Sequence, residues 1–300
     1  MNMAKKQRKN LARLNLRTVF ATLALLSIFL GIWTSRSITQ RNAVEAIKDL
    51  GGEVLYSNED SGRLPETIAS WLGQDFVFSV YSVNLQDTDI TDKDLRLLTD
   101  IPSIEGLYLS GTNVVGTGFD NLLQLKNLKS IGFGAKITNE SLRHVGKLRS
   151  LTHLSFGHAK QIDDDGLLYL SDLTNLERVN LWHTGMSDEG LETISALPRI
   201  RAIIAGGTKI TDSGTRCLRK NQTLEVLVLQ NTIIGDETLK NLSKISTLKE
   251  LVVTGTNITD DGLASLNDCQ HLKKLSRSTN FTTSTGRVSL QLRLPTTAIH

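Results

Sequence analysis

The sequence is poor in features that signal chemistry. It contains two cysteines among 300 residues, and neither lies in a Cys/His spacing that would bind zinc. It has no G-x-S-x-G nucleophile elbow, no G-x-x-x-x-G-K-S/T phosphate loop and no glycine-rich G-G-x-G-x-D nonapeptide for calcium. Nucleophilic catalysis, nucleotide binding and metal binding therefore find no support. We predict a protein that is not an enzyme, with no catalytic residue, metal or cofactor.

Most of the chain also lacks an excess of basic residues. The formal net charge is +3, from 34 Lys and Arg against 31 Asp and Glu. Six of these bases lie within residues 1–17, which contain no acid, so the remainder has 28 bases against 31 acids and a net charge of −3. A nucleic-acid-binding surface needs a basic patch or stripe. We therefore expect no nucleic-acid partner.

A long uncharged run follows the basic leader. No residue from Thr18 to Ser35 is charged, and these 18 residues come close to the roughly 20 that a helix needs to cross a membrane. The bases of residues 1–17 place that leader in the cytoplasm, and Trp33 lies where an interfacial aromatic residue is expected. A cleaved signal peptide is the alternative, but no A-x-A-like site lies near Trp33. We predict a single-pass membrane anchor at residues 18–35, with the rest of the chain exported.

A unit of about 24 residues recurs over residues 80–271. One such unit buries too little apolar surface to be stable alone, whereas stacked units share a continuous core. The period therefore predicts a solenoid of eight repeats. The eight copies begin at Val80, Ile104, Leu128, Leu151, Leu176, Ile200, Leu224 and Leu248.

Each unit combines two apolar periods. Positions 4 and 6, such as Val179 and Leu181, are apolar on either side of a variable residue, which indicates a short strand with one buried face. Later positions, such as Leu191 and Ile194, are three residues apart, as in a helical turn. Aspartates stand at the start of this helical part, and we predict that they are helix N-caps. They are Asp92, Asp164, Asp188, Asp212, Asp236 and Asp260.

These units resemble the leucine-rich repeat, in the variant that reads LxxLxLxxTxITDxGLxxL. Residues 248–271, LKELVVTGTNITDDGLASLNDCQH, show the pattern in full. The variant is similar to the cysteine-containing repeats found beside F-boxes and to membrane-anchored repeat proteins of bacteria. The resemblance implies an α/β fold: a right-handed leucine-rich-repeat solenoid with a parallel β-sheet on the concave face and short helices on the convex side, preceded here by one transmembrane helix. The function stays open, because this scaffold serves many partners.

The segments on either side of the repeats depart from this pattern. Residues 36–79 are predicted to form an N-terminal cap and linker: a short helix, a strand, and a polar loop at residues 58–70. Residues 272–300 are predicted to form a degenerate C-terminal cap or a disordered tail. Within them, apolar residues alternate with polar ones at Val288, Leu290, Leu292 and Leu294, which is compatible with a capping strand and equally with a disordered tail.

The repeat register also bears on packing and on the thiols. Unit six, at residues 200–223, has Thr215 and Asn221 at positions that are apolar in its neighbours, so we expect its helical side to pack least well. Cys217 and Cys269 lie two repeats apart, which separates them by about 10 Å at one strand spacing per repeat. A disulfide allows a Cα separation of about 7 Å. We expect two free thiols.

Side chains at positions 3, 5 and 7 should project from the concave sheet, because the inward positions alternate with them. Trp, Tyr and Arg dominate the energetics of protein interfaces, and they occur here over four adjacent units. The candidate partner-binding residues are Tyr108, His153, Arg178, Asn180, Trp182 and His183. The alternative is that these are scattered surface residues.

Two histidines occupy the same position in consecutive units. His158 and His183 should therefore be close neighbours, and with a third ligand they could hold zinc. His153 lies too far back along its strand, and no carboxylate is evident nearby. We interpret them as neutral histidines on a ridge of turns, or as a pH-sensitive surface.

The leading hypothesis is a membrane-anchored scaffold that binds a protein or peptide on its concave face. A structural envelope component is the alternative. A substrate receptor of the ubiquitin-ligase type is less favoured, because no F-box-like segment precedes the repeats and an apolar segment does.

Overall fold

The strands stack side by side in chain order. The structure is a computed structural model that describes residues 16–57, 71, 73–277 and 282–300. Its strands form one sheet of 11 strands in the order β1 to β11. They are β1 (Glu53–Tyr56), β2 (Val80–Asn84), β3 (Gly106–Tyr108), β4 (Ser130–Gly132), β5 (His153–Ser155), β6 (Arg178–Asn180), β7 (Ala202–Ile204), β8 (Val226–Val228), β9 (Glu250–Val253), β10 (Lys274–Arg277) and β11 (Ala298–Ile299).

The register of the sheet follows the repeat. From β2 onward the strands pair in parallel, and residues at equivalent repeat positions face one another. Val179, for example, pairs with Leu154 on one side and with Ile203 on the other. Strand β1 precedes the repeats and pairs antiparallel with β2. The predicted parallel sheet is confirmed.

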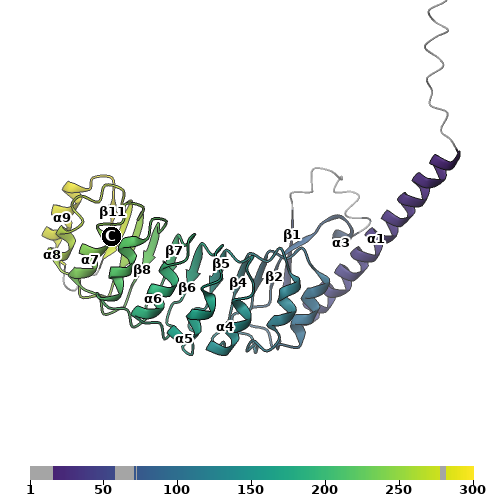
Figure 1. Cartoon of the computed structure of the whole chain (residues 1–300), viewed down its shortest axis with the longest axis horizontal. Coiled ribbons are helices and arrows are strands. Elements are labelled where there is room, and N and C mark those ends of the chain that lie inside the picture. The colour runs from purple at the N-terminus through teal and green to yellow at the C-terminus, as the bar shows by residue number, and fades with distance from the viewer. Residues whose placement is uncertain (1–15, 58–70, 72, 278–281) are drawn as a thin grey trace, which may run out of the picture.

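Short helices run along the other side of the strands. In Figure 1 the sheet lines the inner side of a curved stack and the helices lie along its outer side. Several units have only a 3₁₀ turn where others have an α-helix. The repeat helices are η3 (Asp94–Asp100), η4 (Phe119–Gln124), α4 (Asn139–Val145), α5 (Asp164–Leu167), η5 (Leu168–Leu170), α6 (Asp188–Ser195), η6 (Gly214–Lys220), α7 (Asp236–Leu242), α8 (Asp260–Ala264) and α9 (Ser284–Arg293).

A continuous apolar core lies between the strands and the helices. Position 4 of each unit is buried throughout, as at Val179 and Ile203. Toward the N-terminal half the core also contains a stack of phenylalanines. The ring centroids of Phe119 and Phe133 are 4.8 Å apart, and those of Phe133 and Phe156 are 5.3 Å apart. No unit could bury this surface alone, which is why the repeats are stable only as a stack.

In six of the eight units a threonine closes a tight turn after the strand. The Thr184 hydroxyl donates a hydrogen bond of 2.8 Å to the carbonyl oxygen of Leu181, and the Thr208 hydroxyl donates one of 2.7 Å to that of Ala205. Both threonines are buried. A buried carbonyl without a partner would destabilise the fold, so the threonine is as much a part of the core as the leucines.

The aspartates act between units, and the prediction that they are N-caps is wrong. Asp188 is the first residue of α6, one position too late to cap it. Its carboxylate instead accepts hydrogen bonds of 2.7 Å from both the backbone N–H and the hydroxyl of Thr211, in the next unit.

The same pair of bonds recurs along the stack, and we call the series the aspartate ladder. Asp164 accepts from Ser187, Asp236 from Thr259, and Asp260 from Thr283, with distances between 2.5 and 2.9 Å. Asp212 is a variation: its partners in the next unit are Gly235 and Thr238, and the Thr238 hydroxyl supplies the bond that glycine cannot. Each rung satisfies backbone N–H groups at the start of a helix, where no intrahelical partner exists.

A glycine makes room for the rungs at Asp164, Asp188, Asp236 and Asp260. A Cβ atom on Gly214 would lie 2.2 Å from Asp188 Oδ1, and one on Gly262 would lie 2.1 Å from Asp236 Oδ1. Unit two reverses the pair, because it has Gly116 in place of the aspartate and unit three has Ser141 in place of the glycine. The Ser141 hydroxyl then donates to the Val115 carbonyl oxygen at 2.6 Å. In all of these pairs except Asp212 and Thr238, one member is small so that the other fits.

One long helix joins the N-terminal apolar run to the repeats. Helix α1 (Leu16–Asp49) is continuous through the boundary predicted at residues 35 and 36, so the anchor and the cap helix are not separate. Its last turns are part of the core, with Ala43, Val44 and Ile47 buried. Its N-terminal part projects away from the stack (Figure 1). The rest of the basic leader, residues 1–15, and the loop at residues 58–70 lie outside the described residues.

The C-terminal segment continues the repeat. Residues 284–293 form the helix α9, so the capping strand predicted from their alternation is wrong. Helix α9 occupies the place of the repeat helices, with Leu290 and Leu294 buried. Strand β11 then pairs in parallel with β10. The alternation misled because only Leu290 and Leu294, four residues apart, face inward, as one side of a helix requires.

We expected unit six to be loosely packed at two polar positions, but the structure shows tight packing at one of them. Thr215 is fully buried, its hydroxyl donates to the carbonyl oxygen of Asp212 at 2.8 Å, and it accepts from the Asn241 side chain at 2.8 Å. Hydrogen bonds thus replace the missing leucine.

Both cysteines are free, as the repeat spacing predicted.

The aspartate ladder predicts a coupled effect of substitutions at Asp188 and Gly214. G214A should destabilise the chain by about 1–3 kcal/mol, because the new methyl group overlaps the Asp188 carboxylate. D188G should cost about 1–3 kcal/mol, because the N–H and hydroxyl of Thr211 lose their acceptor. The double variant should lose less than the sum of the two, because removing the carboxylate frees the space.

Urea unfolding followed by circular dichroism measures these differences. G235A is the matched control: its Cβ would have only ordinary contacts, at 3.4 Å from Asp212 Oδ2 and 3.7 Å from the Asn257 carbonyl oxygen. It should cost only about 0.5–1 kcal/mol, because Gly235 is the N-cap of α7 and alanine is a poorer N-cap than glycine, and this cost should add to that of D188G. Strict additivity of D188G and G214A would contradict the assigned contact.

Candidate binding surface on the sheet

The open face of the sheet brings His153 and Arg178 together. They lie opposite each other in adjacent strands β5 and β6, and both are exposed. The hydroxyl of Thr152 lies 2.9 Å from His153 Nδ1, which orients the imidazole at the start of β5. The His153 and Arg178 side chains therefore form one polar corner of the surface, in which the Arg178 guanidinium carries the positive charge.

Trp182 lies just after β6 and is held in a fixed orientation. Its backbone N–H donates to the Asn180 side-chain oxygen at 3.0 Å. Its indole lies over Gly206 of the next unit, where a Cβ would be 2.5 Å from Cζ3. The glycine thus provides a flat seat for the ring. Half-buried in this way, the indole keeps one face available while losing most of its rotational freedom, as interface anchors do.

His183 and His158 continue from the indole along the ridge of turns. The centroids of the Trp182 and His183 rings are 5.5 Å apart in an edge-on contact, and those of His183 and His158 are 5.3 Å apart and stacked. The two histidines have φ values of 54° and 67°. This left-handed backbone recurs at the same repeat position, in Gly111, Gly207 and Gly255 among others, so their role in the turn explains their place.

A zinc site does not form around these histidines. No group of three or more His, Cys, Asp or Glu side chains that could hold a metal ion occurs in the part of the chain that the structure describes. The stacked pair belongs instead to the aromatic edge of the surface, with Trp182.

Tyr108 lies apart from the other predicted residues. It is on β3, three strands from Trp182, which corresponds to about 14 Å. Its ring, 39% exposed, lies beside Gly132 of β4. The predicted set therefore divides into Tyr108 alone and a cluster of His153, Arg178, Asn180, Trp182 and His183.

Four aliphatic side chains that we did not select from the sequence extend this cluster. Ile204, Val228 and Val252 pair in register across β7, β8 and β9, and all lie half-buried on the open face. Val226 lies beside them on β8. We call Ile204, Val226, Val228 and Val252 the aliphatic strip. The sequence held a signal: AII, VLV and LVV are unbroken apolar runs, which indicate strands with apolar contacts on both faces.

A row of ion pairs borders the aliphatic strip. Glu225 accepts hydrogen bonds from Lys249 at 2.7 Å and from Arg201 at 2.9 Å, and Lys274 lies 2.6 Å from Glu250. The Lys249 ammonium and the Arg201 guanidinium hold the pKa of the Glu225 carboxyl below its usual range. Such exposed pairs add little stability. They give the aliphatic strip a charged margin, the arrangement of a protein interface with an apolar centre and polar rim.

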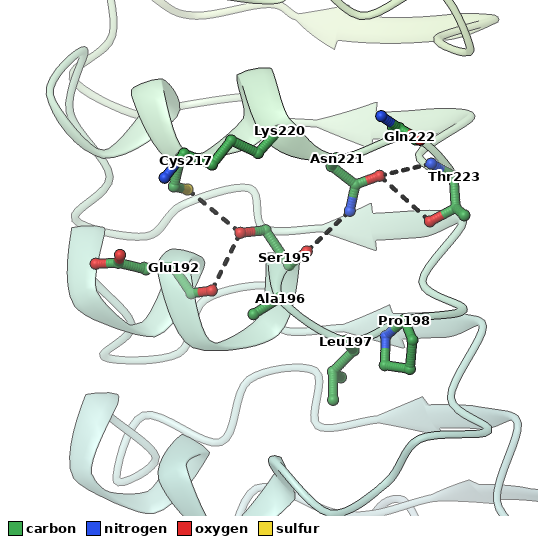
Figure 2. Close-up of a pocket in the computed structure, with 10 residues that line it drawn as sticks. All are labelled: Glu192, Ser195, Ala196, Leu197, Pro198, Cys217, Lys220, Asn221, Gln222 and Thr223. Carbon is green, nitrogen blue, oxygen red and sulfur yellow. Dashed lines mark hydrogen bonds between the residues drawn. The ribbon is translucent and has the colours of Figure 1, made fainter.

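A cleft of about 540 Å³ lies on the opposite, helical side, between α6 and η6. Figure 2 shows the Asn221 amide donating to the Ser195 carbonyl oxygen, at 2.8 Å, and the Ser195 hydroxyl pointing at Cys217 Sγ, at 3.3 Å. Burial raises the pKa of the Cys217 thiol, so the neutral form persists. Burial likewise raises the pKa of Cys269 to about 11. Neither thiol is activated as a nucleophile.

Comparison with known proteins identifies the repeats. A model of the leucine-rich repeat matches residues 147–171, 172–195 and 244–266. Among solved structures, an internalin C2 from Listeria monocytogenes is similar over 68% of this chain and 81% of its own, with 16% identity and a TM-score of 0.54. The chain therefore contains leucine-rich repeats arranged as a solenoid with a parallel sheet and short helices.

Two further solved structures are similar over the same share of the chain. An internalin from Listeria monocytogenes matches 68% of this chain and 69% of its own, with 17% identity and a TM-score of 0.45. A leucine-rich-repeat protein from Leptospira interrogans matches 68% and 62%, with 15% identity and a TM-score of 0.45. No curated protein matches in sequence.

The seat of Trp182 on Gly206 predicts the effect of a substitution that leaves the indole in place. G206A should push the ring off its seat, because the added Cβ would overlap Cζ3, and should change the near-ultraviolet circular dichroism of Trp182. The control is G157A, at the same position two units earlier, where a Cβ would have only an ordinary contact of 3.8 Å to the Asn180 amide. An unchanged spectrum in G206A would contradict the seat.

Proposed function

We propose that this leucine-rich-repeat chain is a membrane-anchored module that binds a protein or peptide partner on the open face of its sheet. Its work is recognition and not catalysis. Leucine-rich-repeat proteins generally bind protein partners, and the parallel sheet with its variable outward positions supplies a wide contact surface.

The observation that carries the proposal is the continuity of Trp182 with the aliphatic strip. A seated indole, four aliphatic side chains and the Arg178 guanidinium lie on adjacent strands of one face. Apolar residues on an exposed sheet are costly unless something covers them, and patches of this kind rimmed by charge are typical of interaction sites. The aromatic and guanidinium groups are those that contribute most when such a surface is buried.

The apolar part of α1 supports the membrane anchor. The helix from Thr18 to Asp49 is long and apolar enough to span a membrane, with a mean hydropathy of 1.8 over its most apolar window. None of that window is buried against the rest of the described chain. Phe20, Leu25 and Phe29 are each more than 60% exposed. A helix that is apolar on all sides and packs against no protein is explained by a lipid environment.

The continuity of α1 supports a retained anchor over a cleaved signal peptide. Residues around Trp33 are helical, and Ser37 is buried against the cap. A signal-peptidase site needs small residues in an A-x-A-like arrangement, whereas here the chain passes from the apolar run into the core without a break. The body is proposed to lie on the exported side, opposite the basic leader.

Crosslinking in the native membrane, followed by quantitative mass spectrometry, tests the proposal. W182A and V228S should each lower the recovery of specific partners at least about tenfold, the effect of losing about 1.4 kcal/mol of binding. The matched control is I233S, which removes a 62% exposed isoleucine from a turn outside the strands. Equal recovery for all three variants would contradict the assigned surface.

A further inference from the structure

We propose that the N-terminal cap rests on the membrane surface through Trp33, Phe76 and Trp71, which we call the membrane seat. The ligand is the interfacial region of a phospholipid bilayer. This proposal rests on the proposed function in one respect, that α1 spans the membrane. Beyond that function, the membrane seat fixes where the solenoid lies relative to the lipid.

First, the apolar run and the cap are separated by only a short stretch of helix α1. The uncharged run ends at Ser35, Arg36 follows, and Ser37 is already buried, being 5% exposed. At 1.5 Å of rise per residue, Ser35 and Ser37 are about 3 Å apart along the helix axis. No linker intervenes, so a spanning α1 brings the cap to the membrane surface.

The second step is that α3 (Gln74–Val77) is attached to α1 at the level of the interface. The ring centroids of Trp33 and Phe76 are 5.9 Å apart in an edge-on contact. About two turns further along α1, the Gln40 amide donates to the Phe78 carbonyl oxygen at 2.9 Å. If Trp33 lies among the lipid headgroups, Phe76 must lie there too.

The third step is the exposure of aromatic surface at this place. Trp71 is 85% exposed, although indole is a ring that normally finds an apolar contact. It precedes Gln74 by three residues, which keeps the two Cα atoms within about 11 Å. Tryptophan prefers the membrane interface, where one edge is apolar and the other is hydrated. A bilayer provides this environment.

The fourth step is the chemistry of the cleft between α1 and the first repeat. It measures about 540 Å³, and Trp33, Phe76 and Phe78 line it together with Arg36. An arginine at the end of an apolar run can reach lipid phosphates while its stem stays in the apolar region. The nearby Asp75 carboxylate accepts from the Tyr56 hydroxyl at 2.7 Å, so its charge is partly satisfied within the protein.

Fluorescence quenching in vesicles tests the membrane seat, because the chain has three tryptophans and the third, Trp182, lies on the distant sheet. Three variants keep one tryptophan each and replace the other two by phenylalanine. The full chain is reconstituted into phosphatidylcholine vesicles, with and without bromine on the acyl chains near the headgroups. The Trp33-only and Trp71-only chains should lose most of their emission, and the Trp182-only chain should keep it.

The outcomes separate the membrane seat from the anchor. Quenching of Trp33 without quenching of Trp71 would overturn the seat and leave the anchor standing. Quenching of neither would overturn both. Circular dichroism checks that each variant is folded, and W182F alone provides the same comparison without a change in the cap, because its remaining emission should fall strongly only if both tryptophans meet lipid.

Discussion

The structure depends on one interaction: the pair of hydrogen bonds from the N–H and hydroxyl at the start of one helix to an aspartate of the preceding unit. The apolar core is largely non-directional and would tolerate many stackings. The Asp188 carboxylate, which grips both groups of Thr211 at 2.7 Å, allows one. The glycines opposite the aspartates admit this contact, and the threonine turns hold the strand ends. Together they set the spacing that aligns equivalent positions along the sheet.

Because of that alignment, the variable outward residues of successive units lie side by side and form one continuous surface. Each outward position lies one strand from its equivalent in the next unit. Ile204, Val228 and Val252 therefore form a line across three strands, although they are far apart in sequence. The glycine pair Gly206 and Gly207 then receives the rings of Trp182 and His183 from the preceding unit. The same device that builds the ladder, a small residue opposite a large one, positions the candidate binding residues.

The repeating part of the fold was open to prediction, since positions such as Val179 and Leu181 report their burial by period alone. The predictions that were wrong concerned residues whose roles depend on contacts within the folded stack. Asp188 resembles an N-cap in the sequence because its hydrogen-bond partner, Thr211, is 23 residues away. Leu290 and Leu294 resemble strand positions because Val288 and Leu292, which are exposed, alternate with them. Of the residues selected from the sequence, the structure brings the rings of Trp182 and His183 into contact, while their role in binding stays a prediction. It missed the aliphatic strip because outward-facing valines on β8 resemble core residues when strands are read one at a time.

The central claim is that a partner is bound on the sheet face and not on the helices. Site-specific photocrosslinking in the native membrane tests it most directly. A photoreactive amino acid in place of Ile204 on the sheet is compared with one in place of Leu168, a 58% exposed leucine on the helical side. Our account predicts a discrete crosslinked partner from position 204 and none of the same mass from position 168. The same crosslinked partner from position 168, with none from position 204, would contradict it.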